Sequence, residues 1–81
     1  MPKAWQDLGY WMNHDLKNAR KIHILLKHIC KNPFEGLGQP KPLKANFSGY
    51  WFRRINHEHF IIYKVEQEKI IVHSLFGHYL D

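Results

Sequence analysis

Two adjacent arginines and a His-x-His pair lie in RRINHEHFIIY, residues 53–63, where the polar chemistry of this sequence is most concentrated. Arginine offers a fixed positive charge for an anionic group, and histidine can accept or donate a proton near neutral pH. A glutamate stands between the histidines, and the apolar run FIIY follows them. Cations and titratable groups that run straight into an apolar strand indicate a site at the edge of a core.

The two arginines cannot both meet one anion directly, because successive side chains of a strand point to opposite faces. Arg54 is the better candidate for an open face, although a surface salt bridge with Glu58 or Glu66 is an alternative. Arg53 would then be structural, and His59 would lie at the margin of the site.

The histidines have several possible uses. His57 and His59 could share one side of a strand, but two imidazoles without a third ligand are a weak indication of metal, and we predict no metal site. His59 could instead be half-buried and hydrogen-bonded, contact a bound anion, or act as a general base.

Composition restricts the classes of protein. The 81 residues make a single domain, 1–81, and 44% hydrophobic residues exclude a disordered tail. A net charge of +5 favours an anionic partner such as nucleic acid, an acidic protein or a membrane surface. Because there is one cysteine, no signal-like segment and no apolar run of about 20 residues, we expect a cytoplasmic protein without disulfides or a membrane span.

Hydrophobic spacing predicts two helices followed by strands. The first helix covers residues 2–12, and Asp15 can cap a second that ends near Lys31. Residues 32–42 hold three of the four prolines and are predicted to be a loop. Alternation then predicts a three-stranded antiparallel meander, with strands at residues 49–55, 59–65 and 69–75. The expected fold is α+β, a helical hairpin packed on a small twisted antiparallel sheet.

One face of this sheet should pack against the helices. Its side chains would be those of Trp51, Ile55, Ile61, Tyr63, Val65 and Leu75. The other face, with Arg54, would stay open and concave, which suits a binding site.

Several literal strings carry a family resemblance. They are PFEG at 33–36, GQPKPLK at 38–44, NFSGYW at 46–51, RRINHEH at 53–59 and the late His78-Tyr79, and WQDLGYW at 5–11 also fits. Together they closely resemble the YoeB toxins, in the RelE superfamily of bacterial toxin–antitoxin systems. The resemblance covers nearly the whole chain.

The resemblance implies a fold like that of microbial ribonucleases and a toxin that cuts mRNA in the ribosomal A site. The expected activity is that of a metal-independent endoribonuclease, an mRNA interferase, which needs no cofactor because the 2′-hydroxyl of RNA is the nucleophile. The implied partners are a cognate YefM-like antitoxin, the ribosome and mRNA. Family members can form dimers, so a homodimer stays open.

Carried over residue by residue, the resemblance gives a mixed site. His78 matches the general acid, and Tyr79 matches the tyrosine beside it that contacts the nucleotide. Lys44 and Arg54 match cations that meet phosphate. Lys41, however, stands where the family has the glutamate proposed as general base, and Phe60 stands where an arginine stabilises the transition state.

These substitutions leave two functions open. Lys41 could accept a proton if neighbouring cations disfavour its charged form, or it could only attract phosphate. We predict His78, Lys41 and Arg54 as the catalytic set, Lys44, Tyr79, Arg53 and His59 as RNA or phosphate contacts, and impaired cleavage. The alternative is a catalytically weak or inactive relative that acts only by binding an antitoxin or the ribosome.

A further departure concerns the sheet. The resemblance places a short apolar strand before the first helix, whereas here the helix pattern begins almost at Met1. We therefore expect the N-terminal edge strand to be missing.

Overall fold

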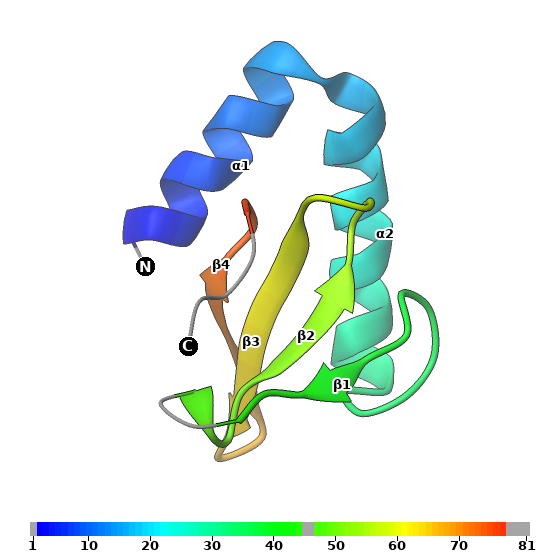
Figure 1. Ribbon diagram of the computed structural model, residues 1–81, viewed down its shortest axis with the longest axis vertical. Coiled ribbons are helices and arrows are strands. Elements are labelled where there is room, and N and C mark those ends of the chain that lie inside the picture. The colour runs from blue at the N-terminus through cyan, green and yellow to red at the C-terminus, as the bar shows by residue number, and fades with distance from the viewer. Residues whose placement is uncertain (1, 45–46, 78–81) are drawn as a thin grey trace.

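The computed structural model describes residues 2–44 and 47–77, which form two helices and four strands. The elements are α1 (Pro2–His14), α2 (Leu16–Lys31), β1 (Lys41–Pro42), β2 (Trp51–Arg54), β3 (Phe60–Glu66) and β4 (Lys69–Ser74). The strands form one antiparallel sheet in the order β1-β2-β3-β4, and the helices cover one of its faces (Figure 1). This architecture confirms the predicted α+β fold.

The sheet has one strand more than the predicted meander. Lys41 and Pro42 fall in the segment predicted to be a loop, yet they pair with Phe52 and Trp51 of β2. Proline has no N–H to donate but an extended backbone suits its fixed φ, so it is tolerated in an edge strand. The proline-rich composition therefore concealed a short edge strand. Within the described part of the chain, no strand precedes α1.

A single non-helical residue, Asp15, separates the two helices. Its carboxylate accepts the backbone N–H of Asn18 at 3.1 Å and the side-chain amide of Asn18 at 2.8 Å. Its own N–H donates to the carbonyl of Trp11 at 2.8 Å. The predicted cap is confirmed. Asp15 provides a hydrogen-bond partner both for a carbonyl at the end of α1 and for an N–H at the start of α2, so the chain can reverse at this one residue.

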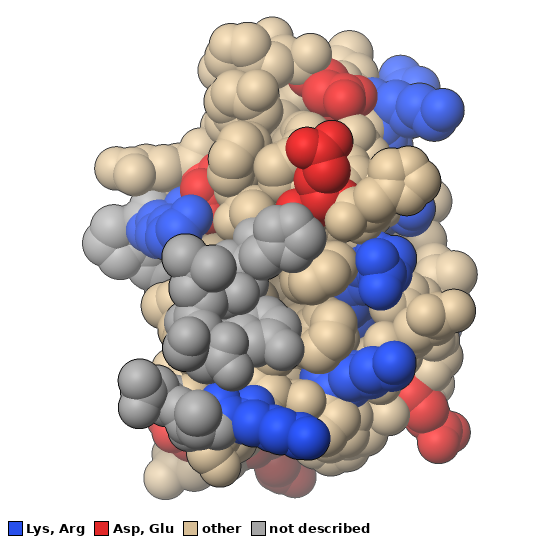
Figure 2. Space-filling model, viewed as in Figure 1, with Lys and Arg blue, Asp and Glu red and all other residues tan. Residues whose placement is uncertain are grey.

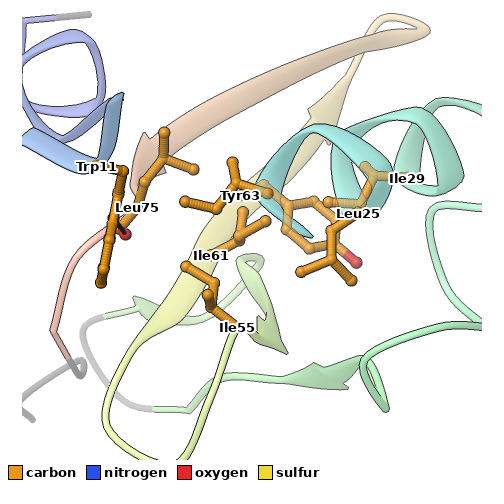
Figure 3. Close-up of a cluster of buried hydrophobic side chains, with 8 residues drawn as sticks. Trp11, Leu25, Ile29, Ile55, Ile61, Tyr63 and Leu75 are labelled. Carbon is orange, nitrogen blue, oxygen red and sulfur yellow. Dashed lines mark hydrogen bonds between the residues drawn. The ribbon is translucent and has the colours of Figure 1, made fainter. Parts of the chain in front are cut away.

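The core lies between the helices and the sheet. Its buried members are Trp11, Ile22, Leu25, Ile29, Ile55, Ile61, Tyr63 and Leu75. In Figure 3, Leu25 and Ile29 of α2 face Tyr63 and Ile61 of β3. The prediction of the inward face is confirmed, except that Trp51 packs at the margin and Val65 is only half-buried and is not in this cluster.

Arg53 also lies on this inward face and is fully buried. Its guanidinium donates to the Tyr63 hydroxyl at 3.1 Å. It also donates to three carbonyl oxygens of the loop between α2 and β1, those of Asn32, Glu35 and Leu37. The Tyr63 hydroxyl in turn donates to the carbonyl of Pro33. Two sheet side chains therefore hold the segment that leads from α2 to β1.

Burial of Tyr63 has an electrostatic consequence. Desolvation raises the pKa of the Tyr63 phenol above its ordinary value, while the hydrogen bond and charge of Arg53 act in the opposite direction. The phenol therefore stays protonated at neutral pH and can donate to the Pro33 carbonyl.

Replacing Arg53 should be far more costly than replacing its neighbour. Arg53→Met removes the four hydrogen bonds and leaves part-buried carbonyls without a donor, so we expect a loss of about 3 kcal/mol in the free energy of unfolding. The exposed Arg54→Met is the matched control and should cost less than about 1 kcal/mol. Urea denaturation measures both, and equal losses would contradict this account.

Candidate active site

Two of the predicted catalytic cations share the open face of the sheet. Lys41 pairs with Phe52, and Arg54 pairs with Phe60, so these four side chains point to the same side. Both cations are exposed. On the face where β1 and β2 lie, Figure 2 shows several Lys and Arg side chains. The strand pairing thus brings together residues that are 13 positions apart in the sequence.

A pair of phenylalanines forms a floor under this face. The rings of Phe52 and Phe60 lie 5.0 Å apart, and Phe60 is only 8% exposed. The guanidinium carbon of Arg54 lies 5.2 Å from the centre of the Phe60 ring, within the range of a cation–π interaction. Phe60 therefore carries no positive charge itself, but its ring packs under the guanidinium of Arg54.

The backbone before Lys41 is fixed against β2 and α2. Arg54 N–H donates to the carbonyl of Gly38 at 2.9 Å. Gly38 has φ +86°, and a Cβ there would lie 2.9 Å from the Leu25 side chain, so only glycine fits. This close approach leaves a shallow pocket of about 210 Å³, lined by Lys21, Leu25, Leu37, Gly38, Gln39 and Arg54. The pocket connects the basic face of α2 with Arg54.

Lys44 is exposed and lies two residues beyond the end of β1. Its carbonyl accepts the N–H of Phe47 at 3.2 Å, and Leu43 N–H donates to the Tyr50 carbonyl at 2.9 Å. The backbone at Lys44 is therefore anchored close to β2, but strand pairing does not place its side chain with Arg54.

An aromatic cluster that the sequence did not predict lies beside these residues. The His73 ring is 5.8 Å from both Phe47 and Tyr50, and the Lys64 ammonium is 5.2 Å from the Tyr50 ring. A hydrogen bond and the charge of Glu66 raise the pKa of Lys64 above its ordinary value. Phe47 and Tyr50 are half-buried and His73 is exposed. Accessible rings next to cations are the usual surface for stacking an unpaired base. The Asn-Phe-Ser-Gly-Tyr string was the only signal for it in the sequence.

His59 is occupied by a contact within the protein. Its Nδ1 accepts the N–H of Gly77 at 2.8 Å, and its ring packs against Trp11 at 4.9 Å and Phe76 at 4.4 Å. Because Nδ1 keeps its lone pair for this bond, the neutral ring carries its proton on Nε2. In this state neither nitrogen has a free lone pair, so His59 is not placed to act as a general base.

Arg53, predicted as an RNA or phosphate contact, lies on the opposite side of the sheet from Arg54. It is fully buried, and its guanidinium donates to the Tyr63 hydroxyl and to the loop carbonyls. The reason is that adjacent residues of a strand point to opposite faces of the sheet, so Arg53 faces inward where Arg54 faces outward. Arg53 therefore has a structural role. His78 and Tyr79 lie outside the described residues.

Two residues that sequence reasoning missed hold the chain just before His78. Asp7 accepts the N–H of Leu75 at 2.9 Å, and Trp11 Nε1 donates to the carbonyl of Leu75 at 2.7 Å. Asp7 is itself buried and pairs with Lys3 at 3.0 Å. The signal was present in WQDLGYW, since residues four apart lie on one face of a helix.

The described residues contain no group of three His, Cys, Asp or Glu side chains that could hold a metal ion. Among those same residues, neither helix is long and apolar enough to cross a membrane.

Comparison with known proteins assigns the chain to a family. Residues 1–79 match the profile of the YoeB-like toxin of bacterial type II toxin–antitoxin systems. The chain belongs to the YoeB toxin family. It is 42% identical to Toxin YoeB of Synechocystis sp. over 76 residues, which are 94% of this chain and 88% of that protein. The resemblance predicted from the motifs is confirmed, and the chain is a toxin of a YoeB-type toxin–antitoxin system.

Solved structures of YoeB toxins share the fold. A YoeB/ParE toxin from Agrobacterium tumefaciens superposes with a TM-score of 0.94 at 36% identity, over 98% of this chain and 94% of that one. The toxin in a YoeB–YefM complex from Staphylococcus aureus gives 0.90 at 42% identity, over 98% and 92%. A YoeB dimer from the same organism gives 0.89 at 44% identity, also over 98% and 92%. The two helices and four strands are therefore the YoeB arrangement.

The indole of Trp11 should contribute more to stability than the exposed indole of Trp5. Trp11→Phe keeps an aromatic ring in the core but leaves the Leu75 carbonyl without its donor, so we expect a loss of about 1–3 kcal/mol in the free energy of unfolding. Trp5→Phe is the matched control, because Trp5 is 77% exposed, and it should leave stability within about 0.5 kcal/mol. Equal urea midpoints for the two variants would contradict the role given to the indole.

Proposed function

We propose that this toxin is a ribosome-dependent endoribonuclease that cleaves mRNA in the A site, and that its cleavage is weaker than that of its relatives. The observation that supports this proposal is the placement of Arg54 and Lys41 on one exposed face, over the Phe52–Phe60 floor. Phe60 N–H also donates to the carbonyl of Gly77 at 3.0 Å. The residue that precedes His78 is therefore bonded to the strand partner of Arg54.

The reaction that this site suits is transesterification within the RNA strand. A base removes the proton of a 2′-hydroxyl, the 2′-oxygen forms a bond to the adjacent phosphorus, and the bond from phosphorus to the 5′-oxygen breaks. An acid gives its proton to that departing oxygen. The products are a 2′,3′-cyclic phosphate and a free 5′-hydroxyl, so the reaction requires only groups that position, stabilise charge and move protons.

The proposed roles follow from charge and position. Arg54 stabilises the negative charge that builds on the phosphate, since its guanidinium is held over the Phe60 ring. His78 is the acid, and Tyr79 and Lys44 contact the nucleotide and its phosphate. Lys41 takes the place of the base.

The weakening has a physical cause in the same residues. A lysine amine is protonated in most molecules at neutral pH, whereas a carboxylate base is ready to accept a proton. The Phe60 ring carries no charge, so the transition state loses one of the cations that the family places there. Both effects reduce the rate of the chemical step and leave ribosome binding intact.

The proposed partners are a YefM-like antitoxin, the ribosome and mRNA. Surface chemistry supports both kinds of partner. The exposed lysines of α2 suit RNA phosphate, and an apolar groove of about 570 Å³ between the helices suits a protein. Leu8, Met12, Leu16, Ala19, Arg20, His23 and Ile24 line this groove. A homodimer would use a surface of the same apolar kind.

The second candidate function is binding alone, to an antitoxin or to the ribosome, without cleavage. Lys41 and Phe60 favour it because they replace the base and a phosphate-binding cation of the family. The apolar groove of the helical layer is unaffected by either substitution, so binding would survive the loss of catalysis.

Primer extension on programmed ribosomes tests the proposal directly. The wild-type protein should produce a cut in the A-site codon, His78→Ala and Arg54→Ala should each reduce its rate by about 100-fold or more, and no cut should appear without ribosomes. The matched control is Lys69→Ala, an exposed cation at the start of β4 that should leave the rate nearly unchanged. Absence of a cut by folded, ribosome-bound protein would favour the binding-only function.

A double substitution tests whether the scaffold is intact. Restoring the family residues in Lys41→Glu/Phe60→Arg should raise the cleavage rate by about tenfold or more, because a carboxylate base and a second cation return to the open face. Lys64→Glu, a charge change of the same sign on β3, should give no such gain. If the double variant folds but cleaves no faster, the weakness does not lie in these two side chains.

A further inference from the structure

The chain segment that leads to His78 is held by four hydrogen bonds from two different layers. Leu75 is bound through its N–H by Asp7 and through its carbonyl by Trp11, both on α1. Gly77 is bound through its N–H by Nδ1 of His59 and through its carbonyl by the N–H of Phe60. Both backbone groups of both residues are thus used, although Leu75 and Gly77 lie outside any helix or strand.

His59 differs from the other three partners because it contributes a side chain from outside any helix or strand. Phe60 contributes a backbone group, and Asp7 and Trp11 are buried in α1. His59 is half-buried at the end of the β2–β3 turn. Its own backbone is fixed there, since its carbonyl accepts from Ile55 at 2.9 Å and its N–H donates to the Asn56 side chain at 3.0 Å.

The geometry at Gly77 explains why such a tether is needed. Gly77 has φ +79°, a left-handed conformation in which the chain turns sharply. A glycine without partners would populate many other conformations, and each would send the next residue in a different direction. The bond from Gly77 N–H to His59 selects one of them.

We infer that His59 is a positioning residue, which fixes the backbone of Gly77, the residue before the general acid, by accepting the Gly77 N–H on Nδ1. This inference rests on the proposed function. It replaces the prediction that His59 contacts RNA, because the ring lies between Trp11 and Phe76 and its acceptor nitrogen is bound to the protein. His59 acts through the backbone and transfers no proton itself.

Two substitutions separate the acceptor from the ring. His59→Asn keeps an acceptor, because its amide oxygen is bonded to Cγ as Nδ1 is, but it loses the ring between Trp11 and Phe76. His59→Phe keeps a ring of similar size but has no acceptor. A role in packing predicts that the phenylalanine variant is the better enzyme, whereas a role in positioning predicts the asparagine variant.

The experiment measures single-turnover cleavage on saturating ribosomes beside the thermal midpoint of each variant. We expect His59→Phe to be at least as heat-stable as His59→Asn but to cleave on the order of 30- to 100-fold more slowly than the wild type, with an unchanged half-saturating ribosome concentration. His59→Asn should stay within about tenfold of the wild type. Cleavage by His59→Phe at the wild-type rate, or rates that simply follow stability, would overturn the inference.

Hydrogen exchange of the Gly77 amide separates failure of this inference from failure of the proposed function. The amide should be protected in the wild type and in His59→Asn and unprotected in His59→Phe. If the wild type makes no cut, the proposed function fails, and the tether is judged by this exchange alone. Equal protection of Gly77 in the wild type and His59→Phe would overturn the tether as well.

Discussion

The buried guanidinium of Arg53 is the interaction on which the rest of the structure depends. The segment between α2 and β1 is rich in proline, and proline has no N–H, so this segment cannot satisfy its own carbonyls through regular structure. Arg53 and Tyr63 supply donors to those carbonyls from the interior. A buried cation is stable only when its donors are used, so the arginine and the loop require one another. The loop held in this way delivers Lys41 to the edge of the sheet.

The alternation of β2 divides two adjacent arginines between two tasks. Arg53 faces the helices and organises a loop, while Arg54 faces outward and lies over Phe60. A shift of the strand register by one residue would exchange them, burying the site cation and exposing the structural one. Such a shift is disfavoured because Trp51, which pairs with the buried Tyr63 and packs against the core, would turn to the other face. Site and core are therefore specified by the same strand.

The sequence was sufficient for local features and insufficient for long-range ones. The Asp15 cap and the 69–74 strand were predicted nearly to the residue, because capping and alternation are properties of a few consecutive positions. Strand β1 was missed because its two residues are recognisable only by their partners on β2. The task of Asp7 and the hydrogen-bond partner of His59 were missed for the same reason, since Asp7 binds the backbone of a residue 68 positions away and His59 that of a residue 18 positions away. Family resemblance named candidate site residues, but only pairing could show that Lys41 and Arg54 share a face.

Leu75 and Gly77 lie outside any helix or strand, which has a structural consequence. A residue in a strand is positioned by its neighbours in the ladder, whereas Leu75 and Gly77 have no ladder and rely on side chains from α1 and the β2–β3 turn. One of these partners is a buried carboxylate, which is costly to desolvate and therefore needs both the Leu75 N–H and Lys3. Helix α1 thus fixes the backbone at Leu75, although it packs on the face of the sheet opposite Arg54. The same helix also presents Leu8 and Met12 to the apolar groove. One helix therefore carries both the side chains that bind Leu75 and part of the surface suited to a protein partner.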